Sequence, residues 1–382
     1  MVKRQYWIQR IEEAWKHRPV VWLAGVRRVG KTCLCQSLSN VEYFDCERPR
    51  IRREMEDPES FLNAMKGKRI ILDEVHRLAN PSQLLKIAAD HYPDIRIIAT
   101  GSSSLGVSAK FKDTLTGRKV NLWLTPLLLK ELADFDKPDI ARRMLHGGLP
   151  GFFLAEQAPD SDFQEWMDAY WSKDIMELFR LERRTSFQRL MELLFVNSGG
   201  LFEATHYAAP CEISRTAVTN YLAVLEQTFV AHVVRPFSTH RPTEIVSAPK
   251  VYAFDTGFVC CFRNWERLRP EDKGFLWEHL ILNELHACLG STAIRYWRDK
   301  RGHEVDFILA DHGRQPRAIE CKWSADSFVP DNILAFRHRY PEGENIVVCH
   351  DVDKAYSRRY GNTEFMFDSI EGLIKSCQHA RL

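Results

Sequence analysis

A glycine-rich segment near the N-terminus has the residue types and spacing of a nucleotide phosphate site. Residues 25–32, GVRRVGKT, read G-x-x-x-x-G-K-T and lie between the apolar run VVWLA and a stretch of helical pattern. Glycine lets backbone N–H groups close around phosphates, Lys31 supplies positive charge to the terminal phosphates, and the Thr32 hydroxyl can bind Mg²⁺. The segment predicts an ATP and Mg²⁺ site formed by Gly25, Val26, Arg27, Arg28, Val29, Gly30, Lys31, Thr32 and Cys33.

Two adjacent carboxylates support this interpretation. Residues 69–74, RIILDE, form an apolar strand pattern that ends in Asp73 and Glu74. Ligands of open α/β sheets bind at the carboxyl ends of strands, where a magnesium ion and an attacking water must be held. We predict that Asp73 holds the metal, directly or through water, and that Glu74 is the general base. The alternative is that both are ordinary strand-end carboxylates.

Two further residues are weaker candidates. The strand pattern DIRIIATGSSS ends in hydroxyls, and Ser102 or Ser103 is predicted to contact the γ-phosphate or the attacking water, although Thr-Gly-Ser is also common in turns. Arg118 in LTGRKV is predicted to act as a catalytic arginine finger or a sensor of nucleotide state. A surface arginine is the alternative. The sequence leaves open whether Arg118 acts within one subunit or across an interface.

A second group of charged residues lies near the C-terminus. Asp306 follows HEV in an apolar β-run, and AIECK places Glu320 and Lys322 on a second run. Alternate residues of a strand share a face, so Glu320 and Lys322 point together. Two carboxylates and a lysine on adjacent strands are the pattern of metal-dependent phosphodiester cleavage. We predict that Asp306, Glu320 and the Cys321 carbonyl bind Mg²⁺, and that Lys322 orients the nucleophilic water.

A third carboxylate is predicted to complete this metal site. At 100° per residue in the helical pattern GFLWEHLILNEL, Glu278 falls within an apolar stripe, where a carboxylate is costly unless it is paired or metal-bound. The alternative is a structural salt bridge with Arg298 or Lys322. The preceding run 295–301, RYWRDKR, mixes cations with aromatic residues and is predicted to contact phosphates and stack on bases, unless it is a solvated loop.

The elements that must position these residues alternate in type along the chain. From Pro19 to Leu124, near-continuously apolar strand patterns alternate with helical ones, which predicts a parallel α/β sheet covered on both faces. Helical periodicity follows, interrupted by HGGLPGFF. We predict four regions: a P-loop core over 1–125, a helical lid or linker over 126–190, a winged helix-turn-helix over 191–249, and an α/β domain over 250–382.

The winged-helix prediction depends on three helical patterns, near 190–199, near 201–210 and from Ser214 onward, with the next strand as the wing. In the third helix the spacing points one group of residues inward, namely Ile213, Ala217, Tyr221, Val224 and Leu225. It leaves a second group outward as base readers: Arg215, Thr216, Thr219 and Asn220. One arginine is little charge for a DNA-binding helix, so protein packing is the alternative.

Composition sets outer limits on the function class. The 382 residues are 45% hydrophobic and 27% charged with a net charge of +2, which excludes wholesale disorder and a coiled coil and does not decide on nucleic acid. The absence of an apolar run near the roughly 20 residues of a membrane span predicts a cytoplasmic protein without membrane contact. The 10 cysteines form no C-x-x-C pair and are interpreted as buried free thiols.

The order of motifs adds a resemblance to a known family. It rests on GVRRVGKT, IILDEVHRL, ATGSSS, TGRKV, HGGLP, YWSKDI, PKVYAFDTG, the helix 274–285, WRDKRGHEVDF and AIECKWS. Over almost its whole length the chain resembles prokaryotic AAA-like ATPases whose C-terminal domain has no assigned function and is similar to the PD-(D/E)-x-K nuclease fold. The resemblance implies ATP binding by the Lys31 loop, a winged-helix middle and a nuclease-like end. All of its motif residues are present: Lys31, Asp73, Glu74, Asp306, Glu320 and Lys322.

Three functions remain in view. The first is an ATPase that couples nucleotide state to a metal-dependent, DNA-interacting, nuclease-like domain. The second is an ATP-dependent regulatory or assembly protein whose nuclease-like domain only binds nucleic acid or protein. The third, a slow nucleotide switch, would have oligomerisation as its output, and a homo-oligomer is compatible with all three.

Overall fold

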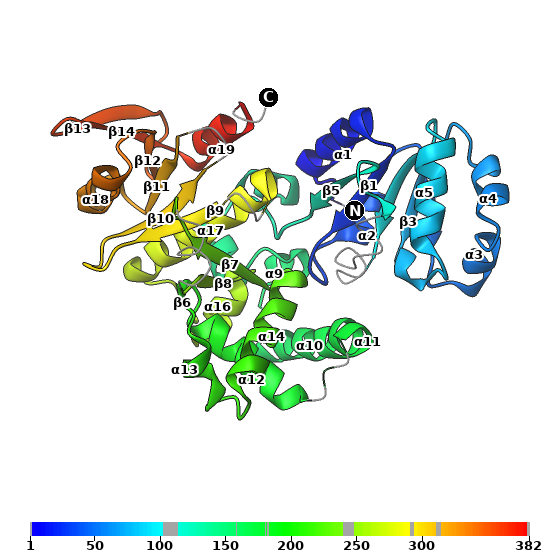
Figure 1. Ribbon diagram of the computed structural model, residues 1–382, viewed down its shortest axis with the longest axis horizontal. Coiled ribbons are helices and arrows are strands. Elements are labelled where there is room, and N and C mark those ends of the chain that lie inside the picture. Colours follow the sequence, from blue (N-terminus) through cyan, green and yellow to red (C-terminus); the bar gives the residue numbers. More distant parts are fainter. Residues whose placement is uncertain are drawn as a thin grey trace. The chain divides into compact units, whose positions relative to one another are not determined.

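The chain folds into two compact units. The computed structural model describes residues 2–101, 114–157, 159–179, 181, 183–239, 248–290, 294–310 and 315–379 (Figure 1). The N-terminal unit is made of residues 1–139, 149–182 and 227–230, and the C-terminal unit of residues 140–148, 183–226 and 231–382. In these described ranges no helix is both long and apolar enough to cross a bilayer.

The N-terminal unit contains the predicted parallel sheet. Its five strands pair in the order β2-β3-β4-β1-β5, every neighbouring pair parallel. They are β1 (Val20–Ala24), β2 (Glu42–Asp45), β3 (Arg69–Asp73), β4 (Arg96–Thr100) and β5 (Lys119–Trp123). Since β4 lies between β1 and β3, the phosphate loop after β1 and the carboxylates after β3 meet at one edge of the sheet.

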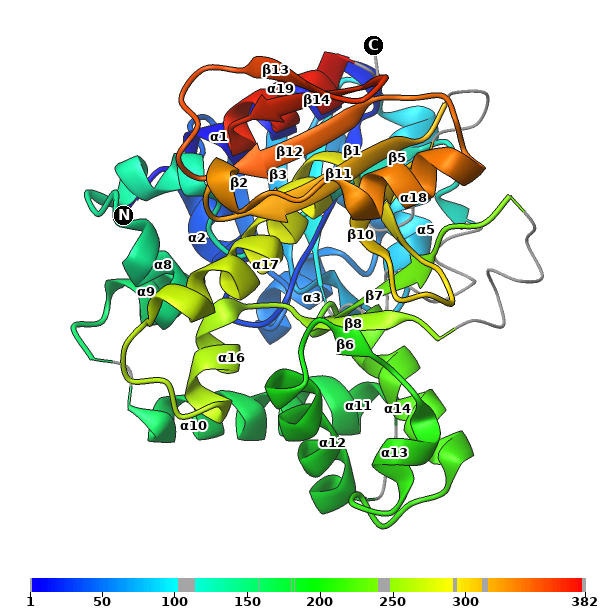
Figure 2. The ribbon, with the colours of Figure 1, turned by 90° about the vertical axis from the view of Figure 1, so that its left-hand side faces the viewer.

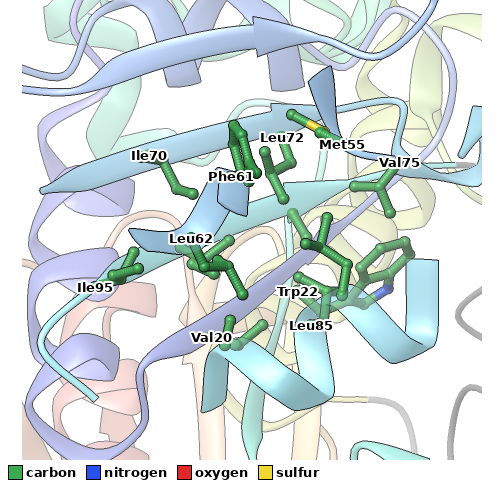
Figure 3. Packing of buried hydrophobic residues seen from close by; sticks show 14 of the residues in the cluster. Val20, Trp22, Met55, Phe61, Leu62, Ile70, Leu72, Val75, Leu85 and Ile95 are labelled. Atoms are coloured by element: carbon green, nitrogen blue, oxygen red, sulfur yellow. The ribbon is translucent and has the colours of Figure 1, made fainter. Parts of the chain in front are cut away.

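The N-terminal unit also contains short helices. They are α1 (Gln5–His17), α2 (Lys31–Gln36), α3 (Pro49–Glu54), α4 (Pro58–Ala64), α5 (Pro81–His91), α9 (Pro150–Leu154), α10 (Asp160–Tyr170) and α11 (Met176–Phe179). The 3₁₀ helices η1 (Val75–Arg77) and η2 (Leu129–Phe135) and the π-helical turn η3 (Trp171–Ile175) complete the unit. Side chains of α4 and α5 pack on β1 and β3 in a cluster that includes Phe61, Leu85, Trp22 and Leu72 (Figure 3).

Leu72 is a direct test of this core. Its side chain is fully buried in β3, one residue before Asp73. We expect Leu72→Ala to lower the free energy of unfolding by about 2–5 kcal/mol, because the substitution removes buried methyl groups and leaves a cavity. Urea unfolding followed by tryptophan fluorescence measures the change. A loss below about 1 kcal/mol would contradict the close packing of Leu72 between β3 and the helices.

The C-terminal unit is built on a nine-stranded mixed sheet. Its order is β13-β14-β12-β11-β10-β9-β7-β8-β6. The strands are β6 (Gly200–Leu201), β7 (Ala231–Pro236), β8 (Lys250–Ala253), β9 (Ile294–Arg298), β10 (Glu304–Leu309), β11 (Arg317–Lys322), β12 (Asn345–Cys349), β13 (Tyr356–Tyr360) and β14 (Thr363–Asp368). The helices are α8 (Ile140–His146), α12 (Arg184–Val196), α13 (Ala204–Ala208), α14 (Arg215–Gln227), α16 (Thr256–Phe262), α17 (Pro270–Leu289), α18 (Asp331–Arg339) and α19 (Ile370–His379), with the 3₁₀ helix η5 (Ala325–Ser327).

Helices cover both faces of the C-terminal part of this sheet. On one face α18 contributes Ile333 and Phe336 to a cluster that includes Val347 of β12. On the other, α17 packs on β11 and α19 on β12, and the two helices contact each other (Figure 2). The Trp277 Nε1 of α17 donates a hydrogen bond to the carbonyl of Val348. Adjacent residues of a strand face opposite ways, so the two sets of helices sandwich the sheet.

The middle region contains the predicted helices and a strand after them. Helices α12, α13 and α14 occur where three helical patterns were predicted, and the predicted base readers on α14 are exposed. On the inner face Val218 and Leu222 are buried, whereas Ile213 and Ala217 are half-buried. The strand predicted as the wing is β7, which pairs antiparallel with β8 along its length and parallel with β9 only at Arg235 and Pro236. A winged helix-turn-helix in this region stays a prediction.

The chain returns briefly to the N-terminal unit after α14. In the segment 227–230 the Thr228 hydroxyl is hydrogen-bonded to Tyr170 Oη at 2.5 Å. The Phe229 ring packs against Trp123 with centroids 4.7 Å apart. The N-terminal unit therefore includes a short piece of chain more than fifty residues beyond α10.

Candidate functional site

The phosphate loop adopts a conformation that depends on its glycines. A Cβ atom at Gly25 would lie 2.5 Å from the carbonyl oxygen of Leu124, so a side chain has no room there. Gly30 has φ 97° immediately before α2, a conformation that costs glycine little. The loop thus follows the end of β1 closely and presents the N-terminus of α2 to the adjoining space.

Lys31, Thr32 and Asp73 come together as predicted. The Lys31 ammonium group donates to the carbonyls of Gly25 at 2.8 Å and Val26 at 3.2 Å. Thr32 Oγ1 donates to Asp73 Oδ2 at 2.9 Å. This direct contact between a hydroxyl and a carboxylate provides two oxygen ligands side by side, which fits the preference of Mg²⁺ for oxygen donors.

Two residues that were not predicted hold Asp73 in place. The Tyr43 hydroxyl donates to Asp73 Oδ2 at 2.5 Å, and the Thr100 hydroxyl donates to Oδ1. Thr100 Oγ1 also accepts a hydrogen bond from the Glu74 backbone N–H at 3.1 Å. The ends of β2, β3 and β4 are therefore tied together around the candidate magnesium ligand.

Glu74 has the geometry of a base facing the phosphate loop. Its φ of 55° is the left-handed conformation, which turns the chain sharply at the end of β3. His76 Nδ1 lies 3.1 Å from Glu74 Oε2. Burial raises the pKa of Glu74, but the hydrogen bond from His76 and the charge of Lys31 outweigh it and hold the pKa below its usual value. Glu74 is consequently ionised and able to accept a proton at neutral pH.

A cavity of about 860 Å³ lies along this constellation. One part of its wall is Lys31, Thr32, Asp73 and Glu74. Another part is apolar and consists of Val2, Phe135, Pro150 and Leu154. A charged region beside an apolar one matches the two chemically different halves of a nucleotide, the phosphates and the base.

The helix α10 and the π turn η3 contact the phosphate loop directly. Arg27 Nε is 2.6 Å from Asp174 Oδ2, and Trp166 Nε1 donates to the Arg27 carbonyl at 3.2 Å. Arg28 Nη2 is 2.5 Å from Glu165 Oε1. The sequence assigns no role to Glu165, Trp166 or Asp174, because nothing in their local pattern indicates that they contact the phosphate loop.

A buried ion pair between Arg4 and Glu131 also contacts the phosphate loop. Arg4 donates to Glu131 Oε1 at 2.7 Å and Oε2 at 2.8 Å, and both side chains are almost completely buried. Arg4 Nη1 also donates to the Val29 carbonyl at 2.9 Å. The Glu131 carboxylate additionally accepts from Trp7 Nε1 at 3.3 Å and the Leu128 N–H at 3.0 Å. Arg4 thus connects the N-terminal segment to the phosphate loop.

The remaining predicted residues of the nucleotide site have different outcomes. Arg118 Nε is 2.6 Å from Asp90 Oδ1, and Arg118 does not line the cavity. Its predicted role as a finger across an interface stays a prediction. Ser102 and Ser103 lie outside the described residues. Cys33 is exposed and lines the cavity.

The C-terminal carboxylates also meet. Strands β10 and β11 are antiparallel with Phe307 opposite Ile319, which places Asp306 opposite Glu320. Asp306 Oδ2 accepts the Cys321 N–H at 2.8 Å. Lys322 Nζ is 3.0 Å from Glu320 Oε1, as expected for residues on one strand face. Glu320 Oε2 is buried and has no hydrogen-bond partner among the described residues.

Glu278 has a different partner from those predicted. Its Oε1 is 3.3 Å from Lys250 Nζ and accepts the Tyr252 hydroxyl at 2.5 Å. Lys250 is itself buried and lies 2.7 Å from Glu304 Oε1. The apolar-stripe argument for Glu278 is wrong, because α17 is buried on nearly all sides between residues 276 and 288. This helix packs against β11, α8, α16 and α19. An apolar stripe is defined by contrast with a solvent-exposed polar face, which this part of α17 lacks.

The electrostatics of this cluster favour a cation. Burial raises the pKa of Asp306 well above its usual value, and the charges of Glu320 and Glu278 add to the increase. Burial also raises the pKa of Glu320, offset only in part by Lys322 and Asn332. As the side chains stand, no three His, Cys, Asp or Glu residues of the described part of the chain are grouped closely enough to hold a metal. The predicted site of three carboxylates stays a prediction.

The basic and aromatic run before Asp306 separates into two environments. Tyr296 and Trp297 are buried, and Trp297 belongs to the core cluster around α18. Arg298, Lys300 and Arg301 are exposed. The prediction of base stacking by the aromatic residues is therefore wrong, since their pattern reflects packing of β9, whereas the cations remain accessible.

Comparison with known families assigns three consecutive parts of the chain. Residues 17–133 match the AAA domain family, residues 137–269 match a domain of unknown function (DUF8612), and residues 273–366 match another (DUF4143). Together with the phosphate loop and the parallel sheet, the first match identifies a P-loop ATPase domain of the AAA type in the N-terminal part.

Related proteins cover most of the chain. The uncharacterized protein Rv2008c of Mycobacterium tuberculosis is 27% identical over 334 residues, which is 84% of this chain and 74% of that protein. The uncharacterized protein MJECL04 of Methanocaldococcus jannaschii is 26% identical over 405 residues, 87% of this chain and 89% of that protein. The solved structure of the Walker-type ATPase PABY2304 of Pyrococcus abyssi is 16% identical with a TM-score of 0.43, covering 69% of this chain and 96% of that one.

Proposed function

We propose that the AAA domain binds and hydrolyses ATP, and that its nucleotide state controls a metal-dependent, DNA-interacting site in the C-terminal unit. The observation that carries the first part is the convergence of Lys31, Thr32, Asp73 and Glu74 on one cavity. Lys31 and Thr32 begin α2, whereas Asp73 and Glu74 lie at the end of β3, so their meeting is a property of the fold and not of one local motif. Each has the chemistry that nucleotide hydrolysis requires.

The phosphates and the base have separate places in this proposal. The Lys31 ammonium group and the loop N–H groups bind the phosphates, and the apolar wall of Val2, Phe135, Pro150 and Leu154 receives the adenine. Thr32 and Asp73 would hold Mg²⁺, which supplies positive charge to the β- and γ-phosphates.

Glu74 acts on the attacking water. It accepts a proton as the water oxygen forms a bond to the γ-phosphorus, and the bond from that phosphorus to the β,γ-bridging oxygen breaks with its electron pair left on ADP. The proton then passes from Glu74 to solvent. Because the pKa of Glu74 is below its usual value, the base is already ionised before ATP binds.

A metal-dependent nuclease-like activity is the second part of the proposal. It is supported by Asp306 opposite Glu320 and by the buried Glu320 Oε2, which has no partner in the described part of the chain and is costly to bury without a ligand. Asp306, Glu320 and the Cys321 carbonyl would hold Mg²⁺, with Glu278 as a further ligand once it leaves Lys250. Lys322 orients a water toward the phosphodiester, and the exposed Arg298, Lys300 and Arg301 attract the DNA backbone.

Plasmid cleavage tests this second part. Supercoiled plasmid and linear single- and double-stranded DNA are incubated with Mg²⁺ or Mn²⁺, with and without ATP. We expect cleavage by the wild type, none by Asp306→Ala because a metal ligand is lost, and an altered rate for Lys31→Ala because nucleotide control is lost. Asp326→Ala, at an exposed aspartate of the same unit, is the matched control.

The alternative function predicts another outcome. If ATP turnover is intact and no DNA is cleaved under any condition, the nuclease part of the proposal is contradicted and the ATPase part stands. The protein would then be an ATP-dependent regulatory or assembly protein whose C-terminal unit only binds nucleic acid or protein. Exposure of Arg215, Thr216, Thr219 and Asn220 on α14 is compatible with either partner.

A further inference from the structure

The π turn η3 brings a second charged pair to the nucleotide cavity. Trp171 and Ile175, at the two ends of this turn, are buried. Between them Lys173 and Asp174 both line the cavity that contains Lys31 and Glu74. A π-helical turn is wider than an α-helical one and occurs often at functional sites. Here it directs two consecutive charged side chains toward the same space.

Asp174 fixes the position of this turn on the phosphate loop. Its carboxylate is 2.6 Å from Arg27 Nε, and Arg27 follows Gly25 by two residues. Asp174 also lines the same cavity as Lys31 and Glu74. Asp174 therefore lies near both the phosphate-binding lysine and the candidate base, which is the end of the cavity where the γ-phosphate would be.

The Lys173 ammonium group is accessible to an anionic ligand in the cavity. Its side chain is exposed, and its ammonium group makes no hydrogen bond or ion pair with the rest of the described chain. Arg27 and Arg28, by contrast, are paired with Asp174 and Glu165. A lysine with no carboxylate partner among the described residues can donate its N–H groups to phosphate oxygens.

We propose that Lys173 is a catalytic residue that contacts the γ-phosphate from within the same chain and stabilises the charge that develops during hydrolysis. This inference rests on the proposed ATPase function and gives the role once predicted for Arg118 to a different residue. Asp174 and Arg27 are positioning residues, because their ion pair holds the π turn against the phosphate loop. A positive charge at the transferring phosphoryl group is among the largest contributions to such reactions.

The first test separates chemistry from binding. We expect Lys173→Ala to lower kcat for ATP about 100-fold, with the Kd for ADP unchanged within about twofold because ADP has no γ-phosphate. Lys173→Arg, which keeps the charge, is expected to recover part of the rate. Ser172→Ala on the same turn is the matched control, since among the described residues Ser172 donates only to the Asp168 and Ala169 carbonyls of α10 and does not line the cavity.

A second test asks whether Lys173 acts within its own chain. Lys31→Ala and Lys173→Ala proteins are mixed in equal amounts, and phosphate release is measured. A residue acting in the same chain gives no recovery, because every chain then lacks one essential group. Recovery of turnover would overturn the assignment, as would a Lys173→Ala rate within about twofold of the wild type. A loss confined to Arg118→Ala would assign the finger to Arg118.

Failure of the parent proposal has a distinct signature. If the wild type neither binds ATP nor releases phosphate, the ATPase function fails, and the assignment of Lys173 fails with it. If the wild type is active and Lys173→Ala is equally active, only the role of Lys173 is contradicted. Comparing ATPγS with ADP adds a readout without turnover: Lys173→Ala is expected to lose affinity for ATPγS and to keep it for ADP.

Discussion

Lys31→Ala is expected to lower kcat for ATP hydrolysis at least about 100-fold, because it removes the one phosphate-loop ammonium group that faces the cavity. Phosphate release at saturating ATP measures the loss. Fluorescent-nucleotide titration is expected to show weaker binding as well, since Lys31 contacts the phosphates in the ground state. The fold is expected to persist, because the hydrogen bonds that Lys31 makes are to the carbonyls of its own loop.

Two comparisons make the Lys31 result specific. Lys66→Ala removes an exposed lysine of the same unit that does not line the cavity, and its turnover is expected to match the wild type. Asp306→Ala changes the C-terminal unit and is expected to spare ATP turnover. Equal losses from Lys31→Ala and Asp306→Ala would contradict two separable sites.

The second large effect concerns stability. Glu131→Ala leaves the Arg4 guanidinium buried without its carboxylate partner, and the expected loss is about 3–5 kcal/mol of unfolding free energy. Trp7 Nε1 and the Leu128 N–H lose an acceptor in the same substitution. Because Arg4 also binds the Val29 carbonyl, nucleotide affinity is expected to fall together with stability. Chemical denaturation and nucleotide titration of one preparation measure both.

A paired substitution distinguishes charge burial from packing. Replacing both partners, as Arg4→Met with Glu131→Leu, is expected to recover part of the stability, since no unpaired charge remains. Glu13→Ala is the control, because Glu13 is exposed and pairs with Lys16 on the surface of α1, and no resolvable change is expected. A Glu131→Ala protein as stable as the wild type would contradict the proposed role of the ion pair.

The N-terminal fold could be predicted because its signals are local. Apolar runs with helical patterns between them are sufficient to predict parallel strands, and the phosphate loop needs only eight consecutive residues. The end of β3 placed Asp73 and Glu74 correctly for the same reason. Ser102 cannot be compared, since it lies outside the described residues.

Long-range partners could not be predicted from such signals. The residues of β7 predict a strand, but they do not predict that it pairs with β8 and β9, because strand pairing depends on packing between distant segments. Lys250, the partner of Glu278, precedes it by twenty-eight residues, and the motif PKVYAFDTG that contains it does not indicate this pairing. Asp174 is likewise an ordinary helical aspartate until folding brings it to Arg27. Sites assembled from several elements are therefore visible in part from the sequence and complete only in the folded chain.

The discontinuous make-up of the N-terminal unit has a consequence for protein synthesis. Its last piece, 227–230, follows the whole of α12, α13 and α14 in the chain. A ribosome delivers residues from the N-terminus at about 5–20 per second. The ATPase unit therefore cannot finish folding when its five strands have left the ribosome, because residues 227–230 are not yet available. Until Thr228 reaches Tyr170, the nascent chain exposes apolar surface that is incompletely packed. Translation pauses or chaperone binding in this interval would act on both units at once.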